Sequence, residues 1–427
     1  MADNFTKYTV EEEYFLTDKN IENDGISDKI NNVLDDLDES TLRNYLDTIT
    51  NTFKGRVTGT KTCHDMGQWI FNELNKLSAL DVRKHYWISR GNVYHKFRRY
   101  SGKNIIADIQ GTSEDTRVIV FSAHYDVGSR NSPGALDNGA GVAALLTIAH
   151  VLSSYEFETT IRFIAFSGEE QGLLGSYAYA KQVYEDNEHI IGVINADVIG
   201  NNTNANLGNY HSLRCFSTYP MNWIIEVMNQ TCTNYNINLI VNHFTYYGNS
   251  DDKSFDDYGF PAMQLFQSGN GMESYYGTEH DKISLINMSY LFEVTKCIAA
   301  SLAVLLDMKH TSIEITKPLE NNIYGDLFDL IPLSKGKTFF IGTPHVTTVV
   351  INESVQIRNV TFSLLKGQNE GRKEEDENVK ISSYIDCQPP FEWFIDKSCF
   401  GWYTIRAEVY DELNNSYADE MEVFIIR

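Results

Sequence analysis

The side chains of this chain that could do chemistry are acids and imidazoles, most of which follow short apolar runs. They are His124, Asp126, Asp137, Glu169, Glu170 and Asp197, with His280 further along the chain. Short apolar runs suit buried parallel strands, and ligands bind at the carboxyl ends of such strands in open α/β folds. Carboxylates and imidazoles that meet at this edge could hold a metal ion, and the work of such a metal is hydrolysis.

His124 and Asp126 stand two residues apart in the triplet His124-Tyr125-Asp126. In extended backbone, residues two apart project to the same side. Asp126 could therefore orient the imidazole of His124 through the ring nitrogen that does not bind metal. A His-x-Asp triplet also arises often by chance, so it indicates little when taken alone.

Asp137 lies in the small-residue segment Gly134-Ala135-Leu136-Asp137-Asn138-Gly139-Ala140-Gly141, which leads into an apolar stretch of helical character. The segment admits two interpretations. Either Asp137 is a metal ligand, or Asp137 or Asn138 is a helix N-cap that accepts backbone N–H bonds. The small residues around Asp137 indicate close backbone packing.

Glu169 and Glu170 are adjacent carboxylates at the end of an apolar run, with Gly168 and Gly172 on either side. Such a pair repels itself unless a cation neutralises one member. If one glutamate binds metal, its neighbour is free to take a proton from water. A solvated acidic loop is the alternative for the pair, and a turn residue is the alternative for Asp197. Because three successive strand–loop units supply suitable residues, their conjunction favours a metal-dependent hydrolase.

The elements that must position these residues alternate between strand and helix. Apolar runs predict strands at 104–109, 118–123, 161–166, 190–196 and 261–266. Helical spacing predicts helices at 42–53, 66–77, 139–152, 173–184 and 221–232, with a long closing helix at 287–308. This alternation predicts an α/β fold with a doubly wound, mostly parallel sheet and helices on both faces. Residues 1–35 are acidic and weakly patterned, which suggests an arm on this domain.

The pattern changes near residues 308–317. Beyond it, apolar residues alternate with polar ones in short runs such as 360–364, 403–409 and 421–425, and no helical period intervenes. A chain of 427 residues is expected to form two domains. We predict a catalytic domain over 1–310 and an all-β, immunoglobulin-like sandwich over 311–427.

Composition limits the partners and the compartment. The formal net charge of −23 disfavours nucleic acid and anionic membranes as partners. No apolar run approaches the roughly 20 residues that span a bilayer, and no signal peptide is visible. Sequons such as those at Asn229 and Asn287 give weak support to a secreted or cell-surface protein whose leader has been removed. Of the six cysteines, Cys387 and Cys399 are close enough in sequence to form a disulfide.

Four motifs together resemble metallopeptidase family 28, the co-catalytic di-zinc aminopeptidases. They are His124-Tyr125-Asp126, Leu136-Asp137-Asn138-Gly139-Ala140-Gly141, Phe166-Ser167-Gly168-Glu169-Glu170-Gln171-Gly172-Leu173-Leu174-Gly175-Ser176 and Asn195-Ala196-Asp197. The resemblance covers about residues 35–308. It implies two zinc ions, which Asp137 bridges, with His124 and Asp197 completing one site. Glu170 and a late histidine would complete the other site. Glu169 would be the general base, and Asp126 would support His124.

Two stretches depart from the family pattern. The late histidine usually follows a tyrosine directly, but here the stretch reads Tyr276-Gly277-Thr278-Glu279-His280-Asp281, so His280 falls three places later. Asp252 stands where many relatives carry histidine, and it is either an alternative metal ligand or a solvated loop acid. Tyr246 and Tyr247 are candidates for hydrogen-bonding a tetrahedral intermediate, although adjacent tyrosines more often simply pack.

The expected function is therefore zinc-dependent removal of N-terminal residues from peptides that carry a free N-terminus. Two alternatives remain on the same fold. One is a catalytically silent, receptor-like ectodomain, which the departures at Gly277 and Asp252 motivate. The other is a single-zinc acyltransferase of the glutaminyl-cyclase type, although the run around Glu169 is more similar to the peptidases. Through Pro389-Pro390-Phe391-Glu392-Trp393 and Gly401-Trp402-Tyr403-Thr404-Ile405, the C-terminal segment resembles immunoglobulin-like modules of secreted prokaryotic enzymes. It carries no catalytic residue set, so we expect it to mediate surface or protein contacts or to position the substrate.

Overall fold

The computed structural model consists of two compact units, Met1–Asp307 and Met308–Arg427. The division falls at the start of the boundary region that we identified at residues 308–317. The structure describes residues 24–93, 96–113, 117–186, 188–202, 211–217, 221–245, 249–258, 260–268, 274–307, 312–317, 322–325, 328–332, 338–351, 357–366, 379–387, 391–411 and 416–427.

The first unit is built on an eight-stranded sheet whose centre is parallel. Its strands are β1 (Asp81–Val93), β2 (Lys96–Ile109), β3 (Val118–His124), β4 (Thr160–Phe166), β5 (Ile190–Ala196), β6 (Ser212–Ser217), β7 (Ile240–Thr245) and β8 (Ala262–Gln267). They lie in the order β1-β2-β4-β3-β5-β8-β6-β7. Strands β4, β3, β5 and β8 run parallel, while β1–β2, β2–β4 and β6–β8 pair antiparallel. The prediction of a mostly parallel α/β sheet is thus confirmed at its centre.

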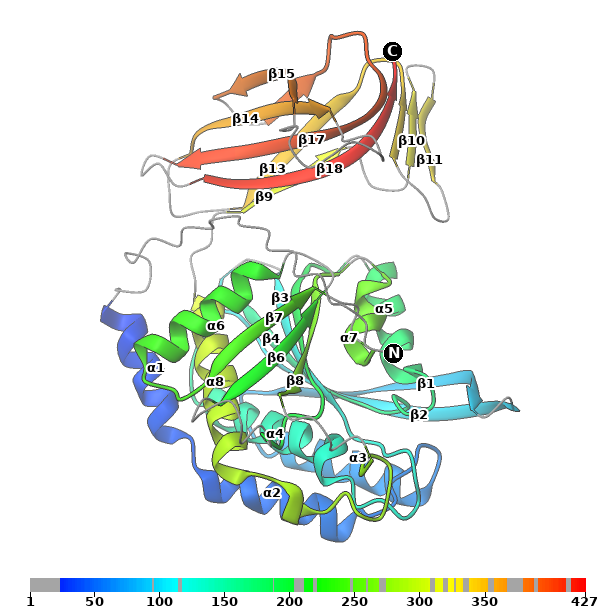
Figure 1. Cartoon of the computed structure of the whole chain (residues 1–427), viewed down its shortest axis with the longest axis vertical. Helices are drawn as coiled ribbons and strands as arrows, with labels where there is room; N and C mark the ends of the chain where they lie inside the picture. The colour runs from blue at the N-terminus through cyan, green and yellow to red at the C-terminus, as the bar shows by residue number, and fades with distance from the viewer. Residues whose placement is uncertain are drawn as a thin grey trace, which may run out of the picture. The chain divides into compact units, whose positions relative to one another are not determined.

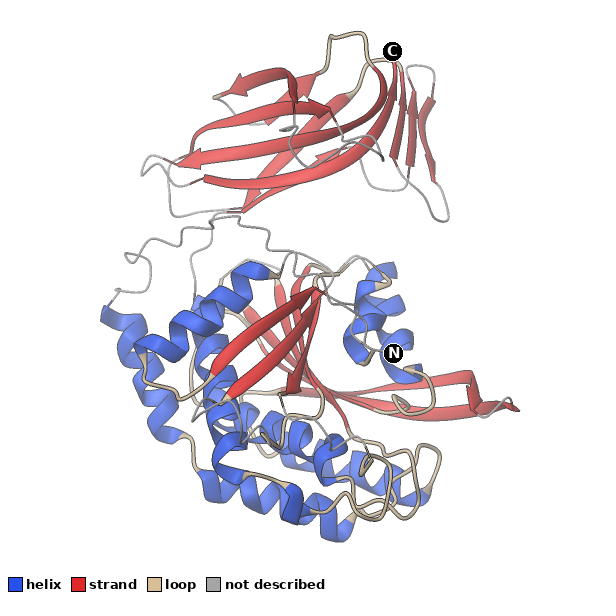
Figure 2. Ribbon diagram, viewed as in Figure 1, coloured by secondary structure: helices blue, strands red, loops and turns tan. Residues whose placement is uncertain are grey.

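Helices cover both faces of this sheet (Figure 2). They are α1 (Asp24–Asp36), α2 (Glu39–Thr52), α3 (Lys61–Leu74), α4 (Ala140–Leu152), α5 (Leu174–Glu185), α6 (Asn222–Asn234), α7 (Asp251–Asp256) and α8 (Met288–Asp307). A short π-turn, η2 (Ala135–Gly139), precedes α4, and a 3-10 turn, η3 (Ile283–Leu285), precedes α8. Helix α4 packs on β3 with α2 and α8 beside it, whereas α5 and α7 pack together and contact strands of the same sheet.

Two elements of the first unit were missed or only partly predicted. The β1–β2 hairpin extends from the sheet (Figure 1), but the sequence showed only the inner end of β2. In β1 the short apolar run Tyr86-Trp87-Ile88 is surrounded by polar and charged residues, and only Trp87 of the three is buried, so the sequence carries no clear signal of a buried strand. The expected arm also contains helix α1, which buries Ile30 and Val33 and pairs Lys29 with Asp307 at the end of α8. Residues 1–23 lie outside the described part of the chain.

Among the described residues of the first unit, two segments are long and apolar enough to cross a membrane. They are Ala135–Leu152 and Met288–Asp307, and 89% and 78% of their residues are buried inside the structure. A helix that is apolar on all sides belongs in the core of a large domain when it is covered in this way. Their burial therefore makes them core helices here.

The regular elements of the second unit are all strands within its described residues. Its strands are β9 (Ser312–Lys317), β10 (Asn322–Gly325), β11 (Phe328–Pro332), β12 (Thr338–Ile341), β13 (His345–Ile351), β14 (Ile357–Lys366), β15 (Val379–Asp386), β16 (Phe391–Phe394), β17 (Phe400–Asp411) and β18 (Ser416–Ile426). Seven form one sheet, in the order β11-β10-β12-β18-β17-β14-β15, and β16-β13-β9 form another. Phe362, Trp393 and Ile405 belong to their common core. The immunoglobulin type of this unit stays a prediction, and the suggested disulfide is absent because both Cys387 and Cys399 are free thiols.

Candidate metal centre

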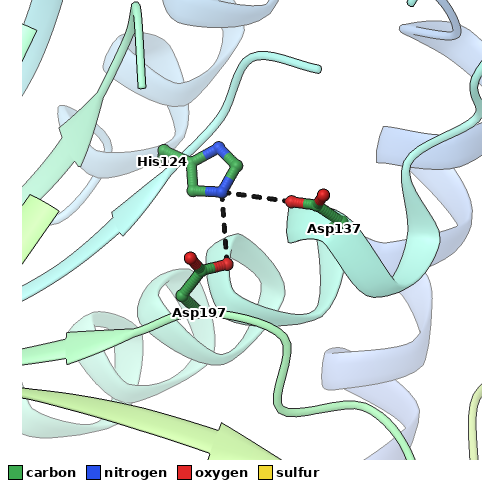
Figure 3. Close-up of side chains that lie close together, drawn as sticks. All are labelled: His124, Asp137 and Asp197. Atoms are coloured by element: carbon green, nitrogen blue, oxygen red, sulfur yellow. Dashed lines mark hydrogen bonds and ion pairs between the residues drawn. The ribbon is translucent and has the colours of Figure 1, made fainter. Parts of the chain in front are cut away.

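Three of the candidate side chains converge at the carboxyl edge of the sheet. His124 ends β3, Asp137 lies in the turn η2, and Asp197 directly follows β5. The Nε2 atom of His124 lies 3.2 Å from Oδ1 of Asp137 and 3.3 Å from Oδ1 of Asp197 (Figure 3). One ligand atom from each residue lies within 4.8 Å of the others, which is the spacing of a metal-binding group. They meet because β3 and β5 are adjacent parallel strands.

The turn before α4 separates the roles of Asp137 and Asn138. Asn138 Oδ1 accepts hydrogen bonds from the backbone N–H groups of Gly141 (3.2 Å) and Val198 (3.4 Å), and its Nδ2 donates to the carbonyl of Ala196 (2.8 Å). The capping interpretation therefore applies to Asn138. The Asp137 carboxylate is left to face His124 and Asp197.

Asp126 lies behind the imidazole of His124. Its Oδ1 is 3.8 Å from His124 Nδ1, the ring nitrogen opposite the carboxylate cluster. Thr58 Oγ1 donates to Asp126 at 2.9 Å, and the backbone N–H of Glu169 donates at 3.3 Å. His124 Nδ1 is buried without a hydrogen-bond partner. The supporting role of Asp126 thus stays a prediction, with its carboxylate on the appropriate side of the ring.

Glu169 and Glu170 follow β4 in a tight turn. Gly168 has φ +85°, and a Cβ there would lie 2.7 Å from the ring of Trp87, so only glycine fits. Burial raises the pKa of Glu169 well above its ordinary value. The charge of His124 lowers this pKa, whereas the carboxylates of Asp197 and Asp251 raise it further. Burial, and then the Asp137 carboxylate, raise the pKa of Glu170 to about 8.

A second acidic pair lies at the start of α7. Asp251 and Asp252 are 0% and 3% exposed, so the solvated-loop interpretation of Asp252 is wrong. Both carboxylate oxygens of Asp251 and Oδ1 of Asp252 have no hydrogen-bond partner. Burial is the main cause that raises the pKa of Asp251 to about 7 and that of Asp252 to about 8. We did not single out Asp251 from the sequence, because nothing local marks it as buried.

This donor set fits a divalent cation. Imidazole nitrogen and carboxylate oxygen are zinc ligands. Glu170 Oε1 and the oxygens of Asp251 are buried acceptors without donors, so they carry desolvation costs that a cation would offset. Coulombic attraction to nearby carboxylates, with Glu169 first, also raises the pKa of His124 against the effect of its burial. The surrounding carboxylates therefore favour positive charge at this site, which a bound cation would supply.

His280 lies apart from the group that His124, Asp137 and Asp197 form. Its side chain is exposed, and its backbone N–H donates to Thr278 Oγ1 at 3.2 Å. Within the described residues, the metal-binding group does not include it. Its role as a ligand stays a prediction. Tyr246 and Tyr247 lie outside the described residues.

Two residues that we did not predict hold the loop between His124 and Asp137. Arg56 is fully buried and donates to the carbonyls of Tyr125 (2.7 Å), Pro133 (2.6 Å) and Gly134 (2.8 Å). The carboxylate of Asp281 accepts the backbone N–H groups of Leu136 (2.7 Å) and Asp137 (3.1 Å). Their partners are backbone atoms far away in sequence, so no local pattern identifies them.

We expect Arg56→Met to lower the free energy of unfolding by about 3 kcal/mol, because three buried carbonyls lose their donors. Urea unfolding of the purified chain measures this change. Arg43→Met is the matched control, since Arg43 is half exposed and pairs with Glu39 at 3.7 Å on one helix. Exposed pairs of this kind contribute about 0.5 kcal/mol or less. Equal effects of the two substitutions would contradict the proposed role of Arg56.

Parts of this chain are similar in sequence to known proteins. Residues 104–302 match the model of peptidase family M28. A probable zinc metalloprotease of Pyrenophora tritici-repentis is 34% identical over 128 residues, which are 25% of this chain and 29% of that protein. A probable leucine aminopeptidase of Trichophyton verrucosum is 25% identical over 63% of this chain and 72% of that protein. The chain thus spans less than a third of the length of the first of these relatives.

Solved structures share the fold. The Bacillus subtilis zinc aminopeptidase BSAP superposes with a TM-score of 0.55 at 17% identity, over 64% of this chain and 96% of that one. Glutaminyl cyclase from Porphyromonas gingivalis gives 0.51 at 19% identity, over 62% and 98%. At these identities the likeness concerns the fold alone. The similarity to peptidase family M28 thus covers residues 104–302, which include the strand-end group around His124.

Proposed function

We propose that the first unit is a zinc-dependent aminopeptidase that removes N-terminal residues from peptides. The observation that carries this proposal is the group formed by His124, Asp137 and Asp197 at the carboxyl edge of the sheet, with Glu169 and Glu170 on the neighbouring strand end. The family and the names of the two relatives agree with this chemistry.

Two zinc ions would share the bridging carboxylate of Asp137. His124 and Asp197 would complete one set of ligands, and Glu170 would belong to the other, with His280 or Asp252 as candidates for its remaining ligand. Zinc bound there supplies Lewis-acid polarisation of the scissile carbonyl and makes water more acidic.

Glu169 is the proposed general base. Its burial and its acidic neighbours raise its pKa, which suits a group that takes a proton from water and passes it to the leaving amine. Asp126 would keep the imidazole of His124 in orientation. The surrounding carboxylates would attract the positively charged N-terminus of a substrate.

Zinc content and product analysis of the purified chain test this proposal. We expect close to two zinc ions per chain and chelator-sensitive release of amine from aminoacyl anilides. Metal-loaded protein that cyclises N-terminal glutamine but hydrolyses no anilide would favour the glutaminyl-cyclase alternative. Protein that binds no zinc and turns over neither substrate would leave the silent, receptor-like alternative.

The remaining ligand can be assigned by substitution. If His280 completes the second site, His280→Ala lowers the bound zinc from two ions to one. Unchanged zinc content in that variant, with a loss in Asp252→Asn, would assign the position to Asp252, which is buried whereas His280 is exposed.

The second unit carries no catalytic set that we recognise in the sequence, so we propose that it mediates surface or protein contacts. An extracytoplasmic location is proposed from the sequons, among them Asn229 and Asn287. Glycosidase treatment of protein expressed through a eukaryotic secretory pathway tests whether these asparagines become modified.

A further inference from the structure

A cavity outside the metal centre lies between the β1–β2 hairpin and the first turn of α3. Its volume is about 360 Å³, which is within the range of small-molecule sites. Its lining combines aromatic, aliphatic and hydroxyl groups with one lysine: Gly59, Thr60, Cys63, His64, Tyr86, Trp87, Ile88, Ser101, Gly102, Lys103 and Tyr125.

One face of the hairpin supplies most of its wall. Tyr86 pairs with Lys103 and Ile88 pairs with Ser101 in the antiparallel register, so these four side chains lie on the same face. Tyr86 is 71% exposed and Ile88 is 64% exposed, whereas Lys103 is only 4% exposed. The cavity therefore has an apolar rim and a lysine in its wall.

Lys103 lines the cavity, and its ammonium group is not among the buried atoms that lack a partner. Its side chain passes over α3 at Gly67, where a Cβ would lie 2.8 Å from Lys103 Cε. Throughout the described residues, its ammonium group makes no hydrogen bond and no ion pair within 4.0 Å. Burial, and then the charge of Lys84, lower its pKa, whereas Cys63 and Asp65 raise it. A carboxylate in the cavity could form a charge-assisted hydrogen bond with this ammonium group.

The charge of the cavity lining favours an anionic ligand over a cationic one. No aspartate or glutamate lines the cavity, although the chain has 58 of them and a net charge of −23. The N-terminal turn of α3 adds partial positive charge. A carboxylate thus finds favourable charge here, whereas an ammonium group finds no acid to pair with.

The cavity is separate from the metal centre. Tyr125 lies between His124 and Asp126 in extended backbone, so its side chain projects to the opposite side from theirs. Its hydroxyl donates to the backbone carbonyl of Lys103 at 2.8 Å. Tyr125 therefore forms a wall of the cavity while its two neighbours face the metal centre.

We infer that this cavity binds a small organic carboxylate with an apolar body and no ammonium group, through the Lys103 side chain and the apolar rim of the hairpin. A free amino acid is disfavoured because no aspartate or glutamate in the lining could pair with its ammonium group. The cavity is thus a site distinct from the one that would receive a peptide N-terminus, and it does not depend on the proposed peptidase activity.

Calorimetric titration of the full chain with 3-phenylpropionate tests this inference. We expect a dissociation constant of about 1 mM or lower, and binding at least about tenfold weaker for 3-phenylpropionamide and for phenylalanine. Lys103→Met should weaken carboxylate binding by at least about tenfold, and Lys103→Arg should retain it within a few-fold. Lys84→Met is the matched control, because Lys84 lies on the same hairpin face but donates to Gln68 at 3.0 Å and does not line the cavity.

The metal centre could also bind a carboxylate, so His124→Ala is titrated in parallel. Binding that survives His124→Ala and is lost in Lys103→Met supports the inference, provided that the melting temperatures of the variants show folded protein. Binding that is lost in His124→Ala and kept in Lys103→Met would overturn it. Equal affinity for the carboxylate and its amide, or no binding at about 10 mM, would overturn it as well.

Discussion

Replacing Glu169 with glutamine is expected to lower kcat for an aminoacyl anilide by about 10²- to 10⁴-fold while the bound zinc is retained. Glutamine keeps the size of the side chain but cannot accept a proton from water. Glu169 does not belong to the group of His124, Asp137 and Asp197, so its loss should leave those three side chains in place. Steady-state kinetics and zinc analysis of the same preparation measure both effects.

Two further variants make this result specific. Glu185→Gln is the control for removing a glutamate, because Glu185 is largely exposed on α5 and pairs only weakly with Lys181 at 3.5 Å. Its activity should equal that of the unchanged chain. Glu170→Gln should instead reduce the zinc content, since Glu170 is the proposed ligand. If Glu169→Gln keeps more than about a tenth of kcat, the general base is another group.

Removing zinc is expected to make the stability of the chain fall as pH rises from about 4 to about 8. Glu170 and Asp252 have pKa values of about 8 in the folded chain, and Asp251 has one of about 7, chiefly through burial. The unfolded chain releases these protons near pH 4, so across this interval the folded state holds more protons. Stability is then greatest below the unfolded pKa and is lost as pH rises through the folded values. The raised pKa of His124 acts in the same direction.

Zinc should reverse this trend, because its ligands bind as deprotonated groups and metal affinity rises with pH. At a zinc concentration about 1,000 times the dissociation constant, the gain is about 4 kcal/mol, or roughly 10 °C in melting temperature. Thermal melting of chelator-treated protein at pH 5 and pH 8, with and without zinc, measures this, and sodium chloride at matched ionic strength is the control. A larger zinc effect at pH 5 than at pH 8 would refute the carboxylate assignment.

The sequence by itself determined the α/β core and showed which candidate residues stand at its strand ends. Apolar runs locate β3, β4 and β5 because a buried parallel strand needs apolar side chains on both faces. The carboxyl ends of such strands share one edge, so His124 and Asp197 could be placed together without any structure. The all-β character of the second unit was likewise visible from the alternation in its strands.

Only the tertiary structure decided which of two neighbouring polar residues caps a helix and which faces the carboxylate cluster. Asn138 is the cap and Asp137 the carboxylate of the cluster because of contacts with Ala196 and Val198, which are distant in sequence. Burial of Asp252 in the short helix α7 and exposure of His280 in a loop follow from tertiary packing, because neither a single helical turn nor a loop has a period from which burial can be inferred.

Side chains that hydrogen-bond to distant backbone groups could not be predicted from the sequence either. Arg56 and Asp281 bind carbonyl and amide groups, which every residue carries, so no partner type marks them. The cavity at Lys103 arises from the register of a half-exposed hairpin against α3, and that alignment is set by long-range packing. Local sequence pattern therefore predicts which residues of a given chemistry stand at the ends of strands. Tertiary contacts decide which of these residues are buried, which are paired within the fold and which are available to bind a ligand.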